Sequence, residues 1–168
     1  MTILHARIAS PVGPLLLSAD EDHLRGIWFS TSRHPLPDGC ALREGDNAIL
    51  RQTTHQLAAY FDGTLQCFDL PLLAVGTPFQ RTVWSMLAHI PYGETWSYAD
   101  LAGRIGKPEA VRAVGAANGR NPIPIVLPCH RVIGKDGSLT GFGGGLPAKR
   151  FLLELEGACP KDDLFRRA

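Results

Sequence analysis

The residues with the clearest capacity for chemistry are Cys129-His130-Arg131, where a thiol is followed directly by a base and a cation. The thiolate is the reactive form of cysteine, and nearby positive charge lowers the thiol pKa from its reference value of about 8.5. An imidazole can remove the thiol proton directly or through one water molecule. The pattern therefore predicts an activated nucleophile at Cys129, and the alternative is a buried, inert cysteine.

A histidine that acts as a base needs an acceptor that orients its ring. Four carboxylates in the second half of the chain are candidates for this role: Glu109, Asp136, Glu154 and Glu156. The residues alone do not choose among them. A Cys/His hydrolase is one alternative, but no oxyanion-hole sequence is evident, and residues adjacent in sequence rarely point at one another.

The cysteine lies in a proline-rich segment, residues 118–132. Its three prolines, Pro122, Pro124 and Pro128, alternate with apolar residues. Proline removes a backbone donor and disfavours helix at the residue before it. The segment is therefore predicted to be a stiff, extended, buried loop that presents Cys129.

Two helix starts precede this loop. Thr77-Pro78-Phe79-Gln80 combines an N-cap threonine, a proline at the first helical position and a glutamine that completes a capping box. This helix is expected to end at Pro91. Ser97 and Asp100 form a second capping box, which predicts a short helix that ends at Gly106.

A third helix is predicted from Pro108 to about Ala117. Two short helices joined by a glycine-containing turn are typical of a helix-turn-helix, with 109–117 in the recognition position, although many such hairpins bind nothing. The third helix carries mostly small side chains, and Arg112 is the long polar residue in its middle. Such a thin helix could approach a DNA minor groove closely, or it could pack against another helix.

The net charge of +1 over 168 residues conceals an uneven distribution. Residues 1–76 carry a net charge of −3, residues 77–168 carry +4, and residues 104–150 alone carry +6. Clustered positive charge favours contact with phosphates, because each neutralised phosphate releases condensed counterions. The alternative is an ordinary solvated basic face.

Other classes of protein are disfavoured by composition. The apolar runs all fall well short of the roughly 20 residues that span a bilayer, and the N-terminus has no signal-peptide core. The four cysteines, at positions 40, 67, 129 and 159, form no CxxC pair. We therefore expect reduced thiols in a cytoplasmic protein with no metal site and no membrane partner.

The first half is predicted to be an α/β domain, residues 1–76, with a small antiparallel sheet and one helix. Apolar runs at 3–9, 15–19 and 24–29 predict a meander of strands, 31–45 a surface loop, and 67–72 a last strand. Helical periodicity spans 47–61. Residues 77–168 are predicted to form a mainly α domain with the helix-turn-helix and a final helix over 146–156, capped by Gly157.

The second half closely resembles the O6-alkylguanine-DNA alkyltransferases, or methylated-DNA–protein-cysteine methyltransferases, in a form without the zinc-bearing regulatory domain. The matching motifs, in the order and spacing of that family, are Thr77-Pro78-Phe79-Gln80, Ile90-Pro91-Tyr92-Gly93, Ser97-Tyr98, Arg112-Ala113-Val114-Gly115, Asn121-Pro122, Pro128-Cys129-His130-Arg131-Val132 and Gly144-Gly145-Leu146. The close match covers about residues 77–157. The first half matches only loosely, through phrases such as Ser10-Pro11-Val12-Gly13-Pro14-Leu15.

The resemblance implies repair of DNA by direct reversal of damage. Cys129 would accept the alkyl group of a flipped O6-alkylguanine, and of O4-alkylthymine, in one irreversible turnover without a cofactor. His130 would act on Cys129 through a water molecule, and Glu156 would orient His130. Tyr98 would donate a proton to the departing base, and Asn121 would brace the recognition helix against the active-site loop.

The resemblance also implies a double-stranded DNA partner, bound through the minor groove by a monomer. Arg112 would fill the space left by the flipped nucleotide. The other DNA-binding positions that it implies are Ala113, Gly115 and Arg120. The guanine pocket would be bounded by Val132, Phe142, Gly143 and Gly144.

Phe142 departs from the family pattern, because many relatives carry tyrosine there. Phenylalanine keeps the stacking face and loses a hydroxyl, so the pocket is expected to survive, and the sequence does not determine which alkyl groups it accepts. Two further alternatives remain on the sequence alone: a protein that binds alkylated DNA without repairing it, and a helix-turn-helix regulator in which Cys129 has no function.

Overall fold

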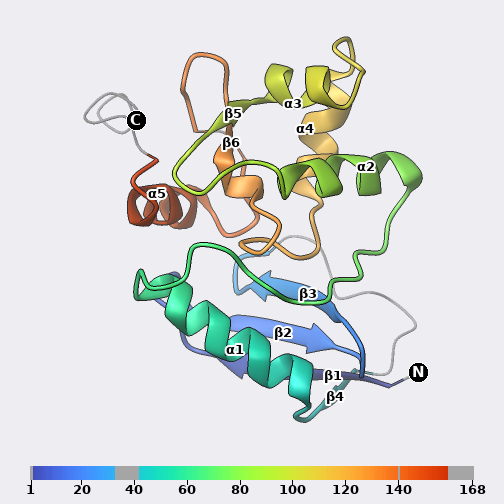
Figure 1. The fold of residues 1–168 in the computed structure, drawn as a ribbon, viewed down its shortest axis with the longest axis vertical. Coiled ribbons are helices and arrows are strands. Elements are labelled where there is room, and N and C mark those ends of the chain that lie inside the picture. Colours follow the sequence, from blue (N-terminus) through green and yellow to red (C-terminus); the bar gives the residue numbers. More distant parts are fainter. Residues whose placement is uncertain (1, 33–41, 140, 159–168) are drawn as a thin grey trace.

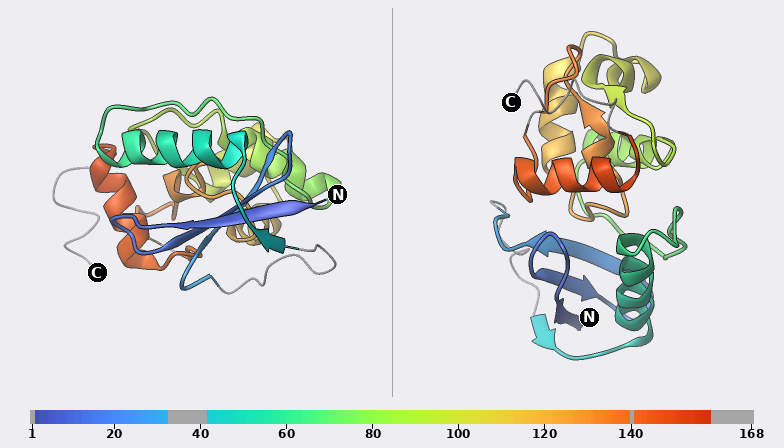
Figure 2. Two further views of the ribbon diagram at one scale, coloured as in Figure 1. Left: turned by 90° about the horizontal axis from the view of Figure 1, so that it is seen from below. Right: turned by 90° about the vertical axis from the view of Figure 1, so that its left-hand side faces the viewer.

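The computed structural model describes residues 2–32, 42–139 and 141–158, and within these ranges the chain forms two stacked halves (Figure 1). The N-terminal half is a four-stranded sheet with one long helix on one of its faces, and the C-terminal half is mainly helical (Figure 2). The N-terminal elements are β1 (Ile3–Ile8), β2 (Leu15–Ala19), β3 (Leu24–Phe29), β4 (Leu42–Glu44) and α1 (Ala48–Phe61). An N-terminal α/β unit followed by a helical one is the predicted fold class, and it is confirmed.

The sheet is mixed, so the expectation of a purely antiparallel sheet is wrong. Its strand order is β3-β2-β1-β4, and β1 pairs antiparallel with β2 but parallel with β4. Parallel pairing requires a long connection, which the chain has between Phe29 and Leu42. Residues 42–44 of the predicted 31–45 loop are therefore strand, and residues 33–41 lie outside the described residues.

The strand predicted at 67–72 does not form. Only Leu72 bridges to Leu24 there. Further along the same edge of β3, the amide of Ile27 donates to the carbonyl of Pro122 at 2.9 Å. The proline-rich loop of the C-terminal half thus occupies the edge that a further strand would need.

Helix α1 begins and ends as its sequence predicts. The Asn47 side chain accepts a hydrogen bond from the Leu50 amide as N-cap, and Asp62 is the C-cap. The buried residues of α1 follow helical spacing on one stripe: Ile49, Leu50, Thr53, Leu57 and Tyr60. This stripe carries a tyrosine at its C-terminal end, which points toward the C-terminal half.

The C-terminal half contains α2 (Pro78–Leu87), α3 (Tyr98–Arg104), α4 (Val111–Gly119) and α5 (Leu146–Leu155). Both predicted capping boxes form, at Thr77 with Gln80 and at Ser97 with Asp100. The third helix starts three residues later than predicted and extends to Gly119, because a turn closed by the Ala110 amide on the Lys107 carbonyl precedes it. Helices α3 and α4 contact each other as a helix-turn-helix.

The segment between α4 and α5 carries Cys129. It is the predicted buried loop as far as Pro128, but Cys129–Arg131 form one 3₁₀ turn, η1, which the extended prediction missed. β6 (Val132–Ile133) follows and pairs parallel with β5 (Trp96–Ser97). Helix α5 ends at Leu155 with Glu156 as its C-cap, and Gly157, at φ +66°, takes the left-handed conformation that stops it.

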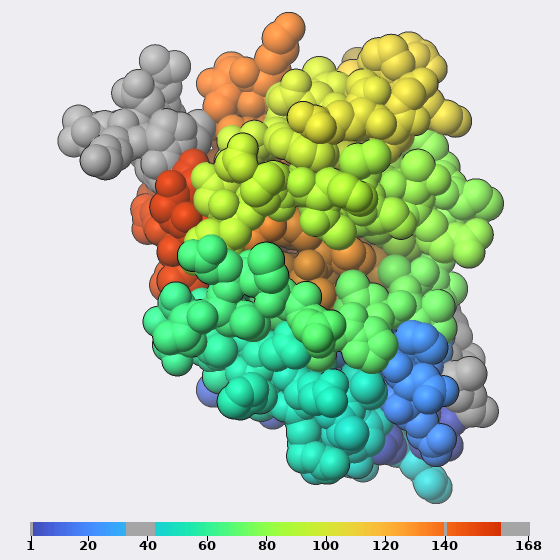
Figure 3. Space-filling model, in the orientation of Figure 1, coloured from blue at the N-terminus to red at the C-terminus, as the bar shows by residue number. Residues whose placement is uncertain are grey.

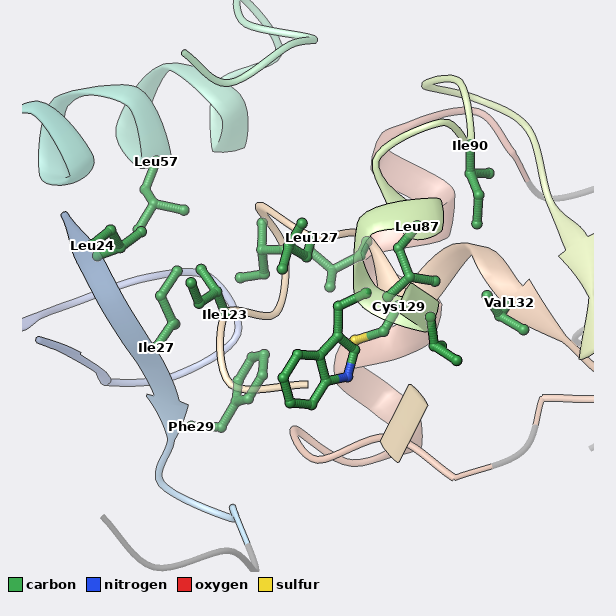
Figure 4. Packing of buried hydrophobic residues seen from close by; sticks show 14 of the residues in the cluster. Leu24, Ile27, Phe29, Leu57, Leu87, Ile90, Ile123, Leu127, Cys129 and Val132 are labelled. Carbon is green, nitrogen blue, oxygen red and sulfur yellow. The ribbon is translucent and has the colours of Figure 1, made fainter. Parts of the chain in front are cut away.

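One hydrophobic core joins the two halves. Ile27 and Leu24 of the sheet lie beside Ile123 and Leu127 of the loop, and Cys129 lies further along the same cluster (Figure 4). The space-filling view shows the halves meeting along a seam in which part of the orange segment after α4 is visible (Figure 3). The cysteine is thus positioned by packing from both halves. Among the described helices, none combines the length and apolarity needed to cross a bilayer.

Candidate active site

The Cys129 side chain is buried in the core between the two halves. Its exposed fraction is 5%, and Leu87, Leu127 and Val132 lie around it (Figure 4). Burial raises the pKa of the Cys129 thiol, although hydrogen bonding from Asn121 and the charge of Lys149 act in the opposite direction. A thiol held in its neutral form needs a base before it can act as a nucleophile.

The loop before Cys129 is braced by two asparagines. The Asn121 side chain donates to the Leu127 carbonyl at 2.7 Å and accepts from the Ile123 amide at 3.0 Å. Asn118, on α4, donates to the Cys129 carbonyl at 3.5 Å. Asn121 therefore holds the loop to itself, and Asn118 makes the direct link from the predicted recognition helix to the cysteine.

The same loop holds a strained backbone position. Ile125 has φ +74°, which a β-branched residue rarely adopts. Such positions cost on the order of 1–3 kcal/mol and persist only where the surroundings fix them. Here the Ile125 side chain is buried, and the Leu127 amide bonds to the Ile123 carbonyl across the turn at 2.9 Å.

His130 is fully buried and faces a carboxylate. Its Nε2 lies 2.7 Å from Oε2 of Glu156, so of the four candidate acceptors the structure brings Glu156 to the ring. Burial lowers the pKa of His130 even though Glu156 opposes the shift, and the ring is neutral at neutral pH. Nδ1 of His130 is buried without a hydrogen-bond partner among the described residues.

Three side chains donate to the Glu156 carboxylate. Arg131 Nε bonds to Oε1 at 2.7 Å and Nη2 to Oε2 at 3.1 Å, and the Tyr60 hydroxyl bonds to Oε2 at 2.5 Å. Burial opposes ionisation of Glu156, but the hydrogen bonds and charges of His130 and Arg131 prevail and lower its pKa to about 2. The ionised carboxylate can only accept, so His130 Nε2 carries the proton.

This protonation fixes which ring nitrogen of His130 is basic. With the proton on Nε2, the lone pair is on Nδ1, the buried nitrogen that lacks a partner. An unpartnered buried acceptor next to the Cys129 turn fits a bridging water molecule. A free lone pair on Nδ1 is what the predicted role of His130 as a base for Cys129 requires.

The expectation that flanking cations lower the thiol pKa is wrong for both neighbours. His130 is neutral, and Arg131 turns away to Glu156 and to the Ile90 carbonyl, which its Nη1 contacts at 2.6 Å. The cation that acts on the thiol is Lys149, which is fully buried on α5 and donates to the Val132 carbonyl at 2.7 Å. Burial lowers the pKa of Lys149 to about 8.

The predicted pocket residues lie in β6 and in the loop just before the start of α5, and this loop contacts the N-terminal sheet. Val132 is buried, and the Phe142 ring meets the Phe29 ring edge-on at 5.3 Å. A Cβ at Gly144 would lie 2.8 Å from Phe29 and 2.9 Å from Phe142, so only glycine fits between the two rings, whereas Gly143 has open space. The sheet therefore supports the pocket loop directly.

Tyr98, at the start of α3, lies against α4. A methyl group at Gly115 would be 3.7 Å from its ring, so the small residue lets the two helices of the helix-turn-helix pack closely. On the outer face of α4, Arg112, Ala113 and Arg120 are exposed. This face is small and basic, as predicted.

The basic cluster is smaller on the surface than its sequence suggests. Of its eight cations, Arg131 and Lys149 are buried in the active site. Arg104 lies over the Trp96 ring at 4.0 Å and Lys107 over Phe79 at 5.6 Å. Arg104 and Lys107 remain exposed beside these rings, so only the two buried cations, Arg131 and Lys149, are removed from the charge that can reach a phosphate.

Comparison with known proteins agrees with this geometry over almost the whole chain. The family model for the 6-O-methylguanine DNA methyltransferase, DNA binding domain, matches residues 78–158, and that for the ribonuclease-like domain matches residues 3–74. The chain belongs to the 6-O-methylguanine DNA methyltransferase family. The predicted family is confirmed, and the match extends to the N-terminal half, where the sequence resemblance was loose.

Individual members of the family are similar over nearly their full length. A methylated-DNA–protein-cysteine methyltransferase of Methanosarcina acetivorans is 48% identical, covering 92% of this chain and 99% of that protein. One from Mycobacterium tuberculosis is 48% identical, covering 96% and 98%. The crystal structure of Mycobacterium tuberculosis OGT in complex with DNA has a TM-score of 0.84 at 45% identity, covering 94% of each chain.

Four side chains near the centre of this methyltransferase fold were missed as functional candidates: Tyr60, Phe29, Asn118 and Lys149. Lys149 had a readable signal, because it lies on the same helical stripe as the buried Leu152 and Leu153. Tyr60 and Phe29 had none, because their contacts depend on how the halves stack. Among the described residues, no group of three or more potential ligands could hold a metal ion, and Cys40 and Cys159 lie outside those residues.

Proposed function

We propose that this protein repairs alkylated double-stranded DNA by transferring the alkyl group of O6-alkylguanine, and of O4-alkylthymine, to Cys129. The observation that carries the proposal is that the buried thiol of Cys129 is followed in the same 3₁₀ turn by the buried His130, whose Nε2 is bound to Glu156 and whose Nδ1 has no hydrogen-bond partner among the described residues. A DNA-binding module or a regulator has no need of a buried base next to a buried thiol. Family membership supports the same conclusion.

The reaction is a displacement at carbon. The sulfur of Cys129 forms a bond to the alkyl carbon as the bond from that carbon to the guanine oxygen breaks. The bonding electron pair leaves with the base, which takes a proton from the Tyr98 hydroxyl as negative charge develops. The thiol proton passes through water to His130, and transfer of one proton from His130, through water, to the Tyr98 phenolate restores both groups, so the sum is a thioether and a restored guanine.

Access to the buried cysteine requires that the damaged nucleotide leave the duplex. Rotation of a base out of the stack costs a few kcal/mol. The exposed, narrow face of α4 supports entry into the minor groove, where Arg112 would occupy the vacated space, with contacts from Ala113, Gly115 and Arg120. We expect the protein to act as a cytoplasmic monomer.

Single turnover is the first expected result. A carbon–sulfur bond does not hydrolyse readily, and the Cys129 surroundings within the described residues contain no second thiol, since Cys67 is exposed elsewhere. Excess duplex containing O6-methylguanine should yield one equivalent of repaired guanine and one methyl adduct on Cys129 by intact-mass spectrometry with peptide mapping. Repair far beyond one equivalent would contradict the mechanism, and binding without an adduct would favour a non-catalytic binder.

Replacement of Arg112 by alanine should slow repair of a duplex far more than reaction with free O6-alkylguanine base, because only the duplex requires flipping. Because flipping costs a few kcal/mol, we expect a loss of about ten-fold or more on duplex and little change on the free base. Arg81→Ala, an exposed arginine on α2, is the matched control. Equal losses on both substrates would remove Arg112 from this role.

A further inference from the structure

The N-terminal half places one polar group in the catalytic centre, the hydroxyl of Tyr60. This hydroxyl donates to Oε2 of Glu156 at 2.5 Å, and the same oxygen accepts from His130 Nε2 at 2.7 Å. Tyr60 is fully buried and lies 96 positions before Glu156 in the chain. A hydroxyl of the N-terminal half thus shares the acceptor Oε2 of Glu156 with His130, the proposed base.

The phenol of Tyr60 is held rigidly. Its ring packs against Phe61 at 5.4 Å, Phe68 at 5.3 Å and Tyr92 at 6.4 Å, measured between ring centroids. Burial and the neighbouring charge of Glu156 raise the pKa of Tyr60, so the hydroxyl keeps its proton. The group is therefore a permanent donor in a fixed place.

A fixed donor on Oε2 has two consequences for His130. It restricts the carboxylate to one orientation, and with it the imidazole that bonds to that oxygen. It also takes part of the negative charge that would otherwise stabilise the protonated imidazole. Arg131 cannot replace this effect, since it holds mainly the other oxygen, at 2.7 Å, and reaches Oε2 only at 3.1 Å.

We propose that Tyr60 is a positioning residue for alkyl transfer, which acts through Glu156 to set the orientation and basicity of His130 and so makes the N-terminal half part of the catalytic machinery. The inference rests on the proposed function, because it requires His130 to act as the base. It assigns to the N-terminal half a chemical role in addition to support of the fold.

The test compares Tyr60→Phe with Tyr92→Phe in the full-length chain. Both changes remove one hydroxyl and keep the ring, but within the described part of the chain the hydrogen bond of the Tyr92 hydroxyl goes to a backbone carbonyl, that of Leu155, at 3.4 Å. The measurement is the single-turnover rate constant for methyl transfer from an O6-methylguanine duplex as a function of pH, with duplex affinity and unfolding free energy measured in parallel.

Removal of the Tyr60 hydroxyl should strengthen the pull of Glu156 on protonated His130. The acid limb of the pH–rate profile should then move to higher pH by about half to one unit, since one hydrogen bond contributes about 1 kcal/mol. The rate constant at neutral pH should fall several-fold, with duplex affinity unchanged. The other ionisable groups around His130, which are Glu156, Arg131, Lys149, Cys129 and Tyr92, stay in place in Tyr60→Phe.

The outcomes separate the inference from the proposed function. Absence of methyl transfer in the wild-type protein would overturn the proposed function itself. Transfer in the wild type with an unmoved acid limb in Tyr60→Phe, or with equal effects in Tyr60→Phe and Tyr92→Phe, would overturn the role of Tyr60 and leave the function standing. A shift confined to Tyr60→Phe supports the inference, because a packing defect alone does not move a limb of the profile.

Discussion

Cys129→Ser is expected to abolish alkyl transfer while leaving affinity for alkylated duplex unchanged. A serine hydroxyl is far less acidic than a thiol, and a neutral histidine in a buried site cannot generate the alkoxide. Cys129 is only 5% exposed, so its replacement leaves the exposed residues of α4 that are proposed to contact DNA unchanged. Affinity is measured by fluorescence anisotropy and transfer by intact mass.

The matched control for this change is Cys67→Ser, which alters an exposed thiol. It should transfer one equivalent at the wild-type rate. An adduct that formed equally well in Cys129→Ser would place the acceptor elsewhere and contradict the assignment. Loss of duplex affinity in Cys129→Ser together with loss of transfer would show instead that the thiol is needed for the bound conformation.

The helical half was largely predictable because its signals are local. Capping boxes at Thr77 and Ser97 and the glycine after Glu156 each involve residues within a few positions of one another, and each formed where it was predicted. The late start of α4 is an example of the limit of such signals. Pro108 predicted a helix start, but Pro108 lies inside the turn that the Ala110 amide closes on the Lys107 carbonyl, and α4 begins after that turn.

The errors in the sheet have a different cause. Strand pairing depends on which segment reaches an edge, and the edge of β3 is occupied by the Pro122 carbonyl, 95 positions from Ile27. The periodicity of residues 67–72 carries no information about that competitor. The periodicity of β1 likewise carries no information about its parallel partner, β4, which pairs at the edge of the sheet opposite β3.

The candidate site shows both kinds of outcome in one cluster. The proposed nucleophile and base could be picked out because Cys129 and His130 are adjacent in sequence, but the same adjacency gave a wrong prediction for the thiol pKa. Arg131 bonds to the carboxylate and not to the thiol. The thiol is instead kept neutral by burial, which is a property of the whole core and is not visible in the tripeptide.

Lys149 and Glu156 illustrate a signal that could have been used. Lys149 on α5 and Glu156, its C-cap, are seven positions apart and continue the helical stripe of the buried Leu152 and Leu153. Helical spacing therefore predicts that a charged group at either position is buried. Buried charges occur where they are paired or do chemistry. Tyr60 gave no such signal, since a tyrosine on an apolar stripe is ordinary and only its partner in the other half, Glu156, distinguishes it.

Glu156→Gln is expected to impair both transfer and stability. The carboxylate accepts hydrogen bonds from Tyr60, His130 and Arg131. In the glutamine variant the amide NH₂ group would face one of these three donors, and Arg131 would have no counter-charge. Breaking a buried ion pair costs about 3–5 kcal/mol of unfolding free energy. Loss of the oriented base should slow methyl transfer about 100-fold or more.

The loss of the Glu156 carboxylate should also change how the unfolding free energy depends on pH. The pKa of Glu156 is lowered from 4.5 to about 2 on folding, so its contribution is complete above about pH 4.5 and is lost as the pH falls toward 2. That contribution is on the order of 3 kcal/mol. Wild-type unfolding free energy, measured by urea titration, should therefore fall more steeply over this interval than that of Glu156→Gln.

Glu154→Gln is the control for Glu156→Gln, because it makes the same chemical change on an exposed residue of the same helix. It should keep the wild-type rate, stability and slope with pH. If Glu156→Gln matched this control in rate, His130 would not depend on the carboxylate for its orientation, and the base would have to be sought elsewhere. If the two variants matched only in the slope with pH, Glu156 would be neutral in the folded protein, and the assignment of the proton to His130 Nε2 would fail with it.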